Sequence, residues 1–169
     1  RFNANQAVSD IESIEKTIET GALSMSLYRP VEAEEDQVWF KVYHPDSAIP
    51  LSDVLPMLED MGLKVLDEYP YEVRPDINGD CLVMIHDFGL KNRNGSKINL
   101  AAIRQKFQEA FRRIWSGEVE SDGFNALVLL GGLGWRDVMV LRACCKYLRQ
   151  AGIAFSQTYM EQTLSSNPH

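Results

Sequence analysis

A ligand-binding loop is the first candidate for chemistry in this sequence. Residues 44–50 read His-Pro-Asp-Ser-Ala-Ile-Pro and connect a strand-like run to a helix-like run. At such a junction, free backbone N–H groups and the N-terminus of the helix could receive a carboxylate. We therefore predict that His44, Asp46 and Ser47 contact a small effector. The alternative is a rigid connection bracketed by the two prolines.

Thiol chemistry has weaker support. Cys81 and His86 fall in one strand-like run, where their odd separation points them to opposite faces, whereas a catalytic thiol and its base need hydrogen-bond reach. Cys144 and Cys145 lie in a helix-like run, where a reduced thiol is usually a small core residue. A partly buried, hydrogen-bonded His86 is the simpler interpretation, and a free-standing cysteine-dependent enzyme stays as an alternative. The scattered histidines show no metal-ligand spacing, so we predict no metal site.

Nucleotide and nucleic-acid binding lack their signatures. The glycine-rich turn at 131–134 follows an apolar run, but Asp137 stands where a dinucleotide loop needs its last glycine, so we predict no cofactor in this chain. A basic stretch could suggest RNA binding, yet no strand carries the aromatic signature of an RNA-recognition module. We predict no nucleic-acid partner and interpret the charges as a solvated helix face. The basic residues are Lys91, Arg93, Lys97, Arg104, Lys106, Arg112 and Arg113.

Composition indicates a globular, acidic protein. The 169 residues are 45% hydrophobic, and 24 acidic against 17 basic side chains give a net charge of −7, which disfavours a nucleic-acid surface. No run approaches the roughly 20 apolar residues of a membrane helix, and the N-terminus lacks a signal-peptide pattern. We predict a cytoplasmic protein with reduced cysteines and no membrane partner. Because the chain begins with Arg1 and ends at His169, we also expect a piece of a longer polypeptide.

The elements that must position these residues follow from hydrophobic periodicity. Alternating apolar residues predict strands, and apolar residues at three- and four-residue spacing predict helices, with Asn99, Asp122 and Ser156 as helix caps. The predicted strands span 23–27, 38–43, 64–74 and 81–88. The predicted helices span 9–20, 52–61, 99–117, 124–130, 135–150 and 156–164.

This order predicts an α+β fold with a ferredoxin-like, four-stranded antiparallel sheet. A right-handed crossover places strands 38–43 and 64–74 parallel with a gap, which strand 81–88 fills antiparallel to both. Two helices cover one face, and a C-terminal helical segment follows. The open face carries Trp39 and Tyr43 as interface candidates, and we expect the C-terminal helices, another domain or a second copy to cover it.

Two segments resemble a known family. WFKVYHPDSAIPLSDVLPMLEDMGLKVLDEYPYEV, from Trp39, and FNALVLLGGLGWRDVMVLRACCKYLRQAGIAFSQTYMEQTL, from Phe124, are similar to the N-terminal regulatory half of the large bacterial NAD-specific glutamate dehydrogenases. The resemblance implies an N-terminal helical lead (1–21), an ACT-like domain (22–117) and a helical segment toward an absent catalytic domain (118–169). It also implies that the catalytic lysine and the Rossmann domain lie elsewhere, so NAD belongs to the parent enzyme and no catalytic residue is expected in this chain.

The resemblance implies a non-catalytic regulatory and assembly segment of an NAD-dependent glutamate dehydrogenase. Its partners would be other domains of the parent chain, further copies in a homo-oligomer, and an amino-acid effector. Amino-acid sensing as the main role is the alternative. Many ACT domains have a glycine in the loop where this chain has Asp46 and Ser47. An acidic residue there would repel an amino acid's carboxylate and could hold its ammonium group.

Overall fold

A four-stranded sheet forms the centre of the protein. The computed structural model describes residues 4–75 and 81–168. The strands are β1 (Ser24–Tyr28), β2 (Gln37–Pro45), β3 (Leu63–Val73) and β4 (Val83–Asn92). Their order is β1-β2-β4-β3, and each neighbouring pair is antiparallel. The predicted α+β fold class is confirmed, including the insertion of the last strand between β2 and β3.

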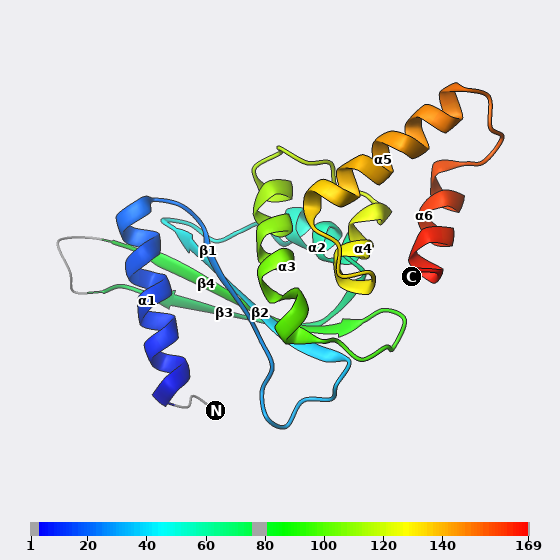
Figure 1. Cartoon of the computed structure of the whole chain (residues 1–169). Helices are drawn as coiled ribbons and strands as arrows, with labels where there is room; N and C mark the ends of the chain where they lie inside the picture. Colours follow the sequence, from blue (N-terminus) through cyan, green and yellow to red (C-terminus); the bar gives the residue numbers. More distant parts are fainter. Residues whose placement is uncertain (1–3, 76–80, 169) are drawn as a thin grey trace.

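Helices lie on both faces of the sheet. Figure 1 shows α2 and α3 together beside the sheet, with α1 apart from them and the C-terminal helices extending beyond α3. The helices are α1 (Ala4–Thr20), α2 (Leu51–Asp60), α3 (Leu100–Trp115), the 3₁₀ helix η1 (Gly123–Asn125), α4 (Ala126–Leu130), α5 (Trp135–Gln150) and α6 (Gln157–Ser166). Within the described part of the chain, no helix is long and apolar enough to cross a membrane.

The main core lies between the sheet and the pair α2 and α3. Alternate residues of β2 point into it, and Phe40 is fully buried there. The ring of Phe40 packs edge-on against Phe107 at 5.4 Å and Phe111 at 4.9 Å between centroids. Phe107 and Phe111 are one turn apart on α3, so the strand period and the helix period meet in a single aromatic cluster.

The opposite face of the sheet is covered in part by α1. Tyr43, Val83 and Ile85 form a second buried cluster, against which Ile14 and Ile18 of α1 pack. For the part of this face around Tyr43, the expectation that C-terminal helices, another domain or a second copy would cover it is therefore corrected; for the remainder it stays a prediction. Ile14 and Ile18 lie one turn apart, and only a short connection separates α1 from β1, so α1 can fold across the sheet.

The three predicted helix caps are present. Each capping side chain accepts a hydrogen bond from a backbone N–H in the first turn of its helix, where such groups have no helical partner. The acceptor and donor pairs are Asn99 and Ala102, Asp122 and Phe124, and Ser156 and Tyr159.

Candidate functional site

The loop after β2 folds back on the end of that strand, which includes His44. His44 Nδ1 lies 2.9 Å from the carbonyl oxygen of Ser47, so Nδ1 carries the proton and donates it. The N–H of Asp46 donates to the carbonyl of Leu82 at 2.9 Å, which joins the loop to the start of β4. The structure thus brings His44 and Ser47 together through the backbone, whereas Asp46 is held by a separate contact.

Asp46 adopts a conformation that favours glycine. Its φ is 66°, in the left-handed region, and it is the only non-glycine residue of the described chain with a positive φ. Short polar side chains such as aspartate tolerate this region better than other residues. The loop therefore has a glycine-like backbone but adds an exposed carboxylate.

The end of the loop is held by His86, which the sequence did not identify as a site residue. Nε2 of this buried imidazole accepts a hydrogen bond from the N–H of Ile49 at 3.1 Å. Nε2 is therefore unprotonated, and Nδ1 donates to Glu68 Oε1 at 2.7 Å. The hydrogen-bonded pair of His86 and Glu68 therefore fixes the backbone of Ile49 just before α2 begins. Pro50, at the N-cap of α2, provides no side-chain hydrogen bond to the helix.

A polar network lies beneath α1. The carboxylate of Asp10 contacts Lys41 Nζ at 2.6 Å and accepts a hydrogen bond from the hydroxyl of Tyr43 at 2.6 Å. Next to it, the hydroxyl of Tyr28 donates to Asp87 Oδ2 at 2.7 Å. Burial, and then the neighbouring carboxylates, raise the pKa of Tyr28 and of Tyr43. Both phenols therefore stay protonated and act as donors.

The two predicted interface residues have different surroundings. Tyr43 is completely buried under α1, so its interface is within the chain. Trp39 is half-buried on the same face, where β3 leaves Tyr69 43% and Tyr71 38% exposed. Contact of Trp39 with another molecule stays a prediction.

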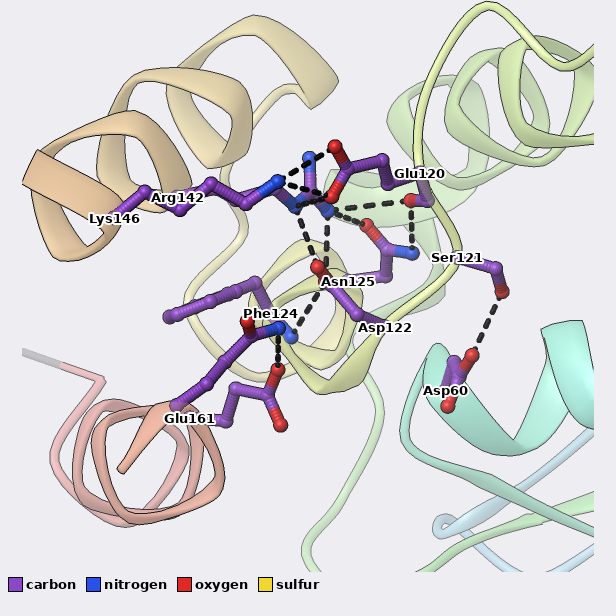
Figure 2. A network of polar contacts seen from close by, with 10 residues as sticks. Asp60, Glu120, Ser121, Asp122, Phe124, Asn125, Arg142, Lys146 and Glu161 are labelled. Atoms are coloured by element: carbon purple, nitrogen blue, oxygen red, sulfur yellow. Dashed lines mark hydrogen bonds and ion pairs between the residues drawn. The ribbon is translucent and has the colours of Figure 1, made fainter. Parts of the chain in front are cut away.

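A second polar network joins the C-terminal helices. Figure 2 shows Arg142 of α5 reaching Asp122, with Nε at 2.7 Å from Oδ2 and Nη2 at 2.8 Å from Oδ1. Nη2 also donates to Asn125 Oδ1 at 2.8 Å, and Arg142 is almost fully buried. Ser121, next in the chain, donates to Asp60 of α2 at 2.7 Å. This network fixes α5 against η1 and connects both to the sheet domain.

The basic stretch is paired with acidic side chains. Several of its members form ion pairs within the chain, which reduces the positive potential available to a nucleic acid. The pairs are Lys91 with Glu34 and Asp36, Arg93 with Glu59, Lys97 with Glu35, and Arg113 with Glu118. Among residues 4–75 and 81–168, no group of three or more histidine, cysteine or acidic residues could hold a metal ion.

The cysteines do not form a reactive pair. Cys81 is half-buried, Cys144 is exposed and Cys145 is buried. Burial raises the pKa of the Cys145 thiol, whereas a catalytic cysteine needs a lowered pKa. His86, the nearest candidate base to Cys81 in sequence, already uses both ring nitrogens.

Two glutamate dehydrogenase family models match the chain. The model described as "Glutamate dehydrogenase, ACT3 domain" matches residues 22–103, and "Glutamate dehydrogenase, helical motif 3" matches residues 119–169. Together they cover more than half of the chain. The matched ranges lie within the predicted 22–117 and 118–169 domains, whose bounds stay a prediction.

Curated relatives carry the same family name. NAD-specific glutamate dehydrogenases of Halomonas elongata and Pseudomonas aeruginosa are 44% and 39% identical over 167 residues, which is 99% of this chain. The enzyme of Mycobacterium tuberculosis is 44% identical over 124 residues, or 70% of the chain. The chain spans 8–10% of the length of these relatives.

Proposed function

Because the chain belongs to the NAD-specific glutamate dehydrogenase family, with its ACT3 domain and helical motif 3, we propose that it is a non-catalytic regulatory and assembly segment. The parent enzyme would convert glutamate, NAD and water to 2-oxoglutarate, ammonium and NADH in another part of its chain. The segment would act in the cytoplasm, in contact with other domains of the parent chain and with further copies in a homo-oligomer.

The observation that carries this proposal is the continuous connection between the sheet domain and the helical segment. The loop at 44–50 leads into α2, and Asp60 at the end of α2 accepts a hydrogen bond from Ser121. One residue further on, Asp122 holds Arg142 of α5. Packed and hydrogen-bonded groups therefore join α2 to α5, and they offer a route along which a displacement of α2 could reach α5.

The turn at 131–134 does not fit NAD. The glycine-rich turn joins α4 to α5, so no strand precedes it as in a dinucleotide-binding loop. At this turn, the N–H of Gly134 donates to Asp137 Oδ2 at 2.9 Å. An acidic side chain therefore takes a donor that a phosphate would need. We propose NAD as the cofactor of the parent enzyme only.

The proposal is tested with the isolated chain and with the parent enzyme. We expect the chain alone to form no NADH from glutamate and NAD. In the parent enzyme, the double substitution Asp122→Leu and Arg142→Met should leave turnover at saturating substrate within about twofold but change the oligomeric mass or the substrate dependence. Glu12→Ala, on the exposed side of α1, is the control. NADH formation by the chain, or lost turnover with unchanged mass and substrate dependence, would contradict the proposal.

Amino-acid sensing is the second candidate function. The glycine-like backbone at Asp46, together with its exposed carboxylate next to the uncapped start of α2, supports it. In this interpretation Asp46 holds the ammonium group, and His44 and Ser47 line the loop. Calorimetric titration with the common amino acids at millimolar concentration tests it, with Asp46→Asn as the variant and Glu32→Gln as the control. No heat of binding for any amino acid would leave only the assembly role.

A further inference from the structure

The part of the sheet face that α1 leaves open combines acidic and aromatic side chains. Helix α1 packs mainly on β1, β2 and β4. In the register of the sheet, Gly89 of β4 lies between Trp39 of β2 and Asp67 of β3. Asp87, two residues earlier in β4, lies next to Tyr69 of β3. Residues two apart in a strand share a face, so these side chains form one surface, which we call the acidic aromatic patch. Its members are Trp39, Asp67, Tyr69 and Asp87.

Two departures from a regular sheet place the carboxylate of Asp67 in this patch. The register of β3 shifts between Val65 and Asp67, as at a β-bulge, and bulges re-aim the side chains that follow them. Gly89 provides the space, because a Cβ there would lie only 2.0 Å from Asp67 Oδ1. A glycine inside a strand often marks the close approach of another group. The carboxylate of Asp67 therefore lies against the backbone of β4, at the strand position beside Trp39.

Neither carboxylate of the patch has a full set of partners. No hydrogen bond or ion pair joins the exposed Asp67 to another residue of the described chain. Asp87 is 7% exposed, and its Oδ1 is closed to solvent and has no hydrogen-bond partner among the described residues. Its Oδ2 accepts from Tyr28 of β1, so Oδ1 is directed away from that hydroxyl. Because a buried oxygen without a donor is unfavourable, a donor that enters the patch from outside would be stabilising.

The charges around the patch leave an acidic excess. Lys41 and Lys91 face it from β2 and β4, but each is paired with acidic side chains outside the patch. Lys64 is exposed on the same face of β3 and is the remaining base on the described strands of this face. Two carboxylates therefore stand against one lysine. The potential at the patch favours a cation.

The aromatic rings indicate which cation fits. A guanidinium group can donate two parallel hydrogen bonds to a carboxylate such as Asp67. It can also stack its plane on the ring of Trp39 or Tyr69, and Tyr69 is 43% exposed. A lysine ammonium has no planar face and acts as a point charge. Carboxylates next to flat aromatic surfaces therefore favour arginine over lysine.

We propose that the acidic aromatic patch is a docking site for an arginine side chain from another domain of the parent chain. The inference rests on the assembly role proposed above and identifies a contact for it. The chain spans 8–10% of the length of its relatives, so most of the parent chain would lie outside it and could supply the arginine. One side chain binds weakly by itself, but attachment within the same polypeptide raises its effective concentration.

Peptide titration followed by NMR tests the chemistry of the patch. The probes are blocked tripeptides with arginine, lysine or glutamine between two glycines. The arginine peptide should shift the amide resonance of Gly89 and the indole resonance of Trp39, with millimolar affinity. Asp67→Asn should weaken its binding roughly fivefold, because the guanidinium loses a charged, bidentate acceptor. Glu72→Gln is the matched control, since Glu72 is exposed on the other face of the same strand.

The titration has two results that would overturn the proposal. Resonances that do not move with the arginine peptide would show that the patch has no affinity for a guanidinium group. Equal or tighter binding of the lysine or glutamine peptide would show that the patch does not select arginine. Circular dichroism checks that Asp67→Asn and Glu72→Gln are folded.

Photo-cross-linking in the parent enzyme tests the partner. With p-benzoylphenylalanine in place of Tyr69, light should attach an arginine-containing peptide from outside these 169 residues, which mass spectrometry identifies. Asp67→Asn should lower the yield several-fold, whereas Glu72→Gln should not. The same probe in place of Val8, which is 56% exposed on α1, measures random capture.

The cross-linking results separate the possible occupants of the patch. A captured peptide from these 169 residues would assign the patch to a second copy, and the absence of a cross-link would leave it without a partner; either result would overturn the proposal. The proposed function is tested separately, by NADH formation and by the variants of Asp122 and Arg142. It can therefore stand if the patch binds no arginine.

Discussion

Asp87 shows how burial changes a single residue. It is 7% exposed, and its Oδ1 has no hydrogen-bond partner within the described part of the chain. Burial raises the pKa of Asp87 although the hydroxyl of Tyr28 and the charge of Lys41 act in the opposite direction. The folded protein therefore binds a proton here more tightly than the unfolded chain does.

The raised pKa of Asp87 predicts a pH dependence of stability. The contribution of Asp87 to the free energy of unfolding is fully present below the ordinary carboxyl pKa of about 4. It is lost as the pH rises through the higher pKa that Asp87 has in the folded protein. Asp87→Asn removes this titration, so the variant should gain stability relative to the native chain between about pH 4 and pH 7. Urea unfolding across this range measures it, with exposed Asp53→Asn as the control. A difference that does not vary with pH would contradict the prediction.

The loop residue Asp46 gives a second prediction. Its left-handed backbone costs an L-residue with a Cβ roughly 1 kcal/mol, and less for aspartate. Asp46→Ala should therefore destabilise the protein by up to about 1 kcal/mol. Asp46→Gly should have a smaller effect, because relief of strain offsets the greater flexibility of the unfolded chain. Denaturant midpoints of the two variants check this, and equal losses would argue against strain at this position.

At the scale of elements, the turn between α2 and β3 is a point of close packing. Gly62 has a φ of 84°, and a Cβ there would lie 3.2 Å from Cβ of Ala126 in α4. Gly117 has a φ of 73° but open space around it. Gly117→Ala should cost about 1 kcal/mol through backbone strain, and Gly62→Ala about 2–3 kcal/mol because α4 must also move. Thermal unfolding of both variants distinguishes strain from contact between the elements.

The pair Arg142 and Asp122 fixes α5 to η1. The side chain of Arg142 is 5% and that of Asp122 13% exposed, so the loss of one leaves the other without its nearest charge partner. Asp122→Ala or Arg142→Met alone should cost about 3–5 kcal/mol, and Asp122→Leu with Arg142→Met should cost clearly less than the sum. A double-mutant cycle by urea unfolding measures the coupling. Additive losses would show that the two residues act independently.

At the scale of the whole molecule, Asp10 anchors α1 on the sheet. It contacts Lys41, whose side chain is 3% exposed, and accepts from Tyr43. Asp10→Ala should cost about 3 kcal/mol and loosen α1, because buried polar groups lose this partner. Glu12→Ala, on the exposed side of α1, should stay within about 0.5 kcal/mol. Unfolding and hydrogen exchange in α1 test both variants.

Local patterns predicted most of the architecture. The alternation around Phe40 and the spacing of Phe107 and Phe111 identified a strand and a helix that do share a core. The cover of the second face around Tyr43 was predicted incorrectly, because periodicity shows that α1 has an apolar stripe but not which surface it packs against. The contacts that join α1 to this surface, such as the ion pair between Asp10 and Lys41, form between distant parts of the sequence.

The candidate site could be predicted only in part. His44, Asp46 and Ser47 are adjacent in sequence, so their location at one loop followed from the strand and helix on either side. His86 and Glu68 come from β4 and β3, and no spacing pattern indicates that they meet below the loop. The left-handed backbone of Asp46 was also unpredictable, because aspartate adopts several turn conformations.

The position of α1 has a consequence for folding. The surface that receives α1 is formed by β1, β2 and β4, and β4 enters the sheet only after the chain has passed through α2 and β3. Helix α1 leaves the ribosome before the strands of this sheet and therefore has no complete docking surface until the last strand is placed, and long-range contacts of this kind form late. In pulse-labelling refolding experiments, amides of α1 should acquire protection after those of β2 and β4.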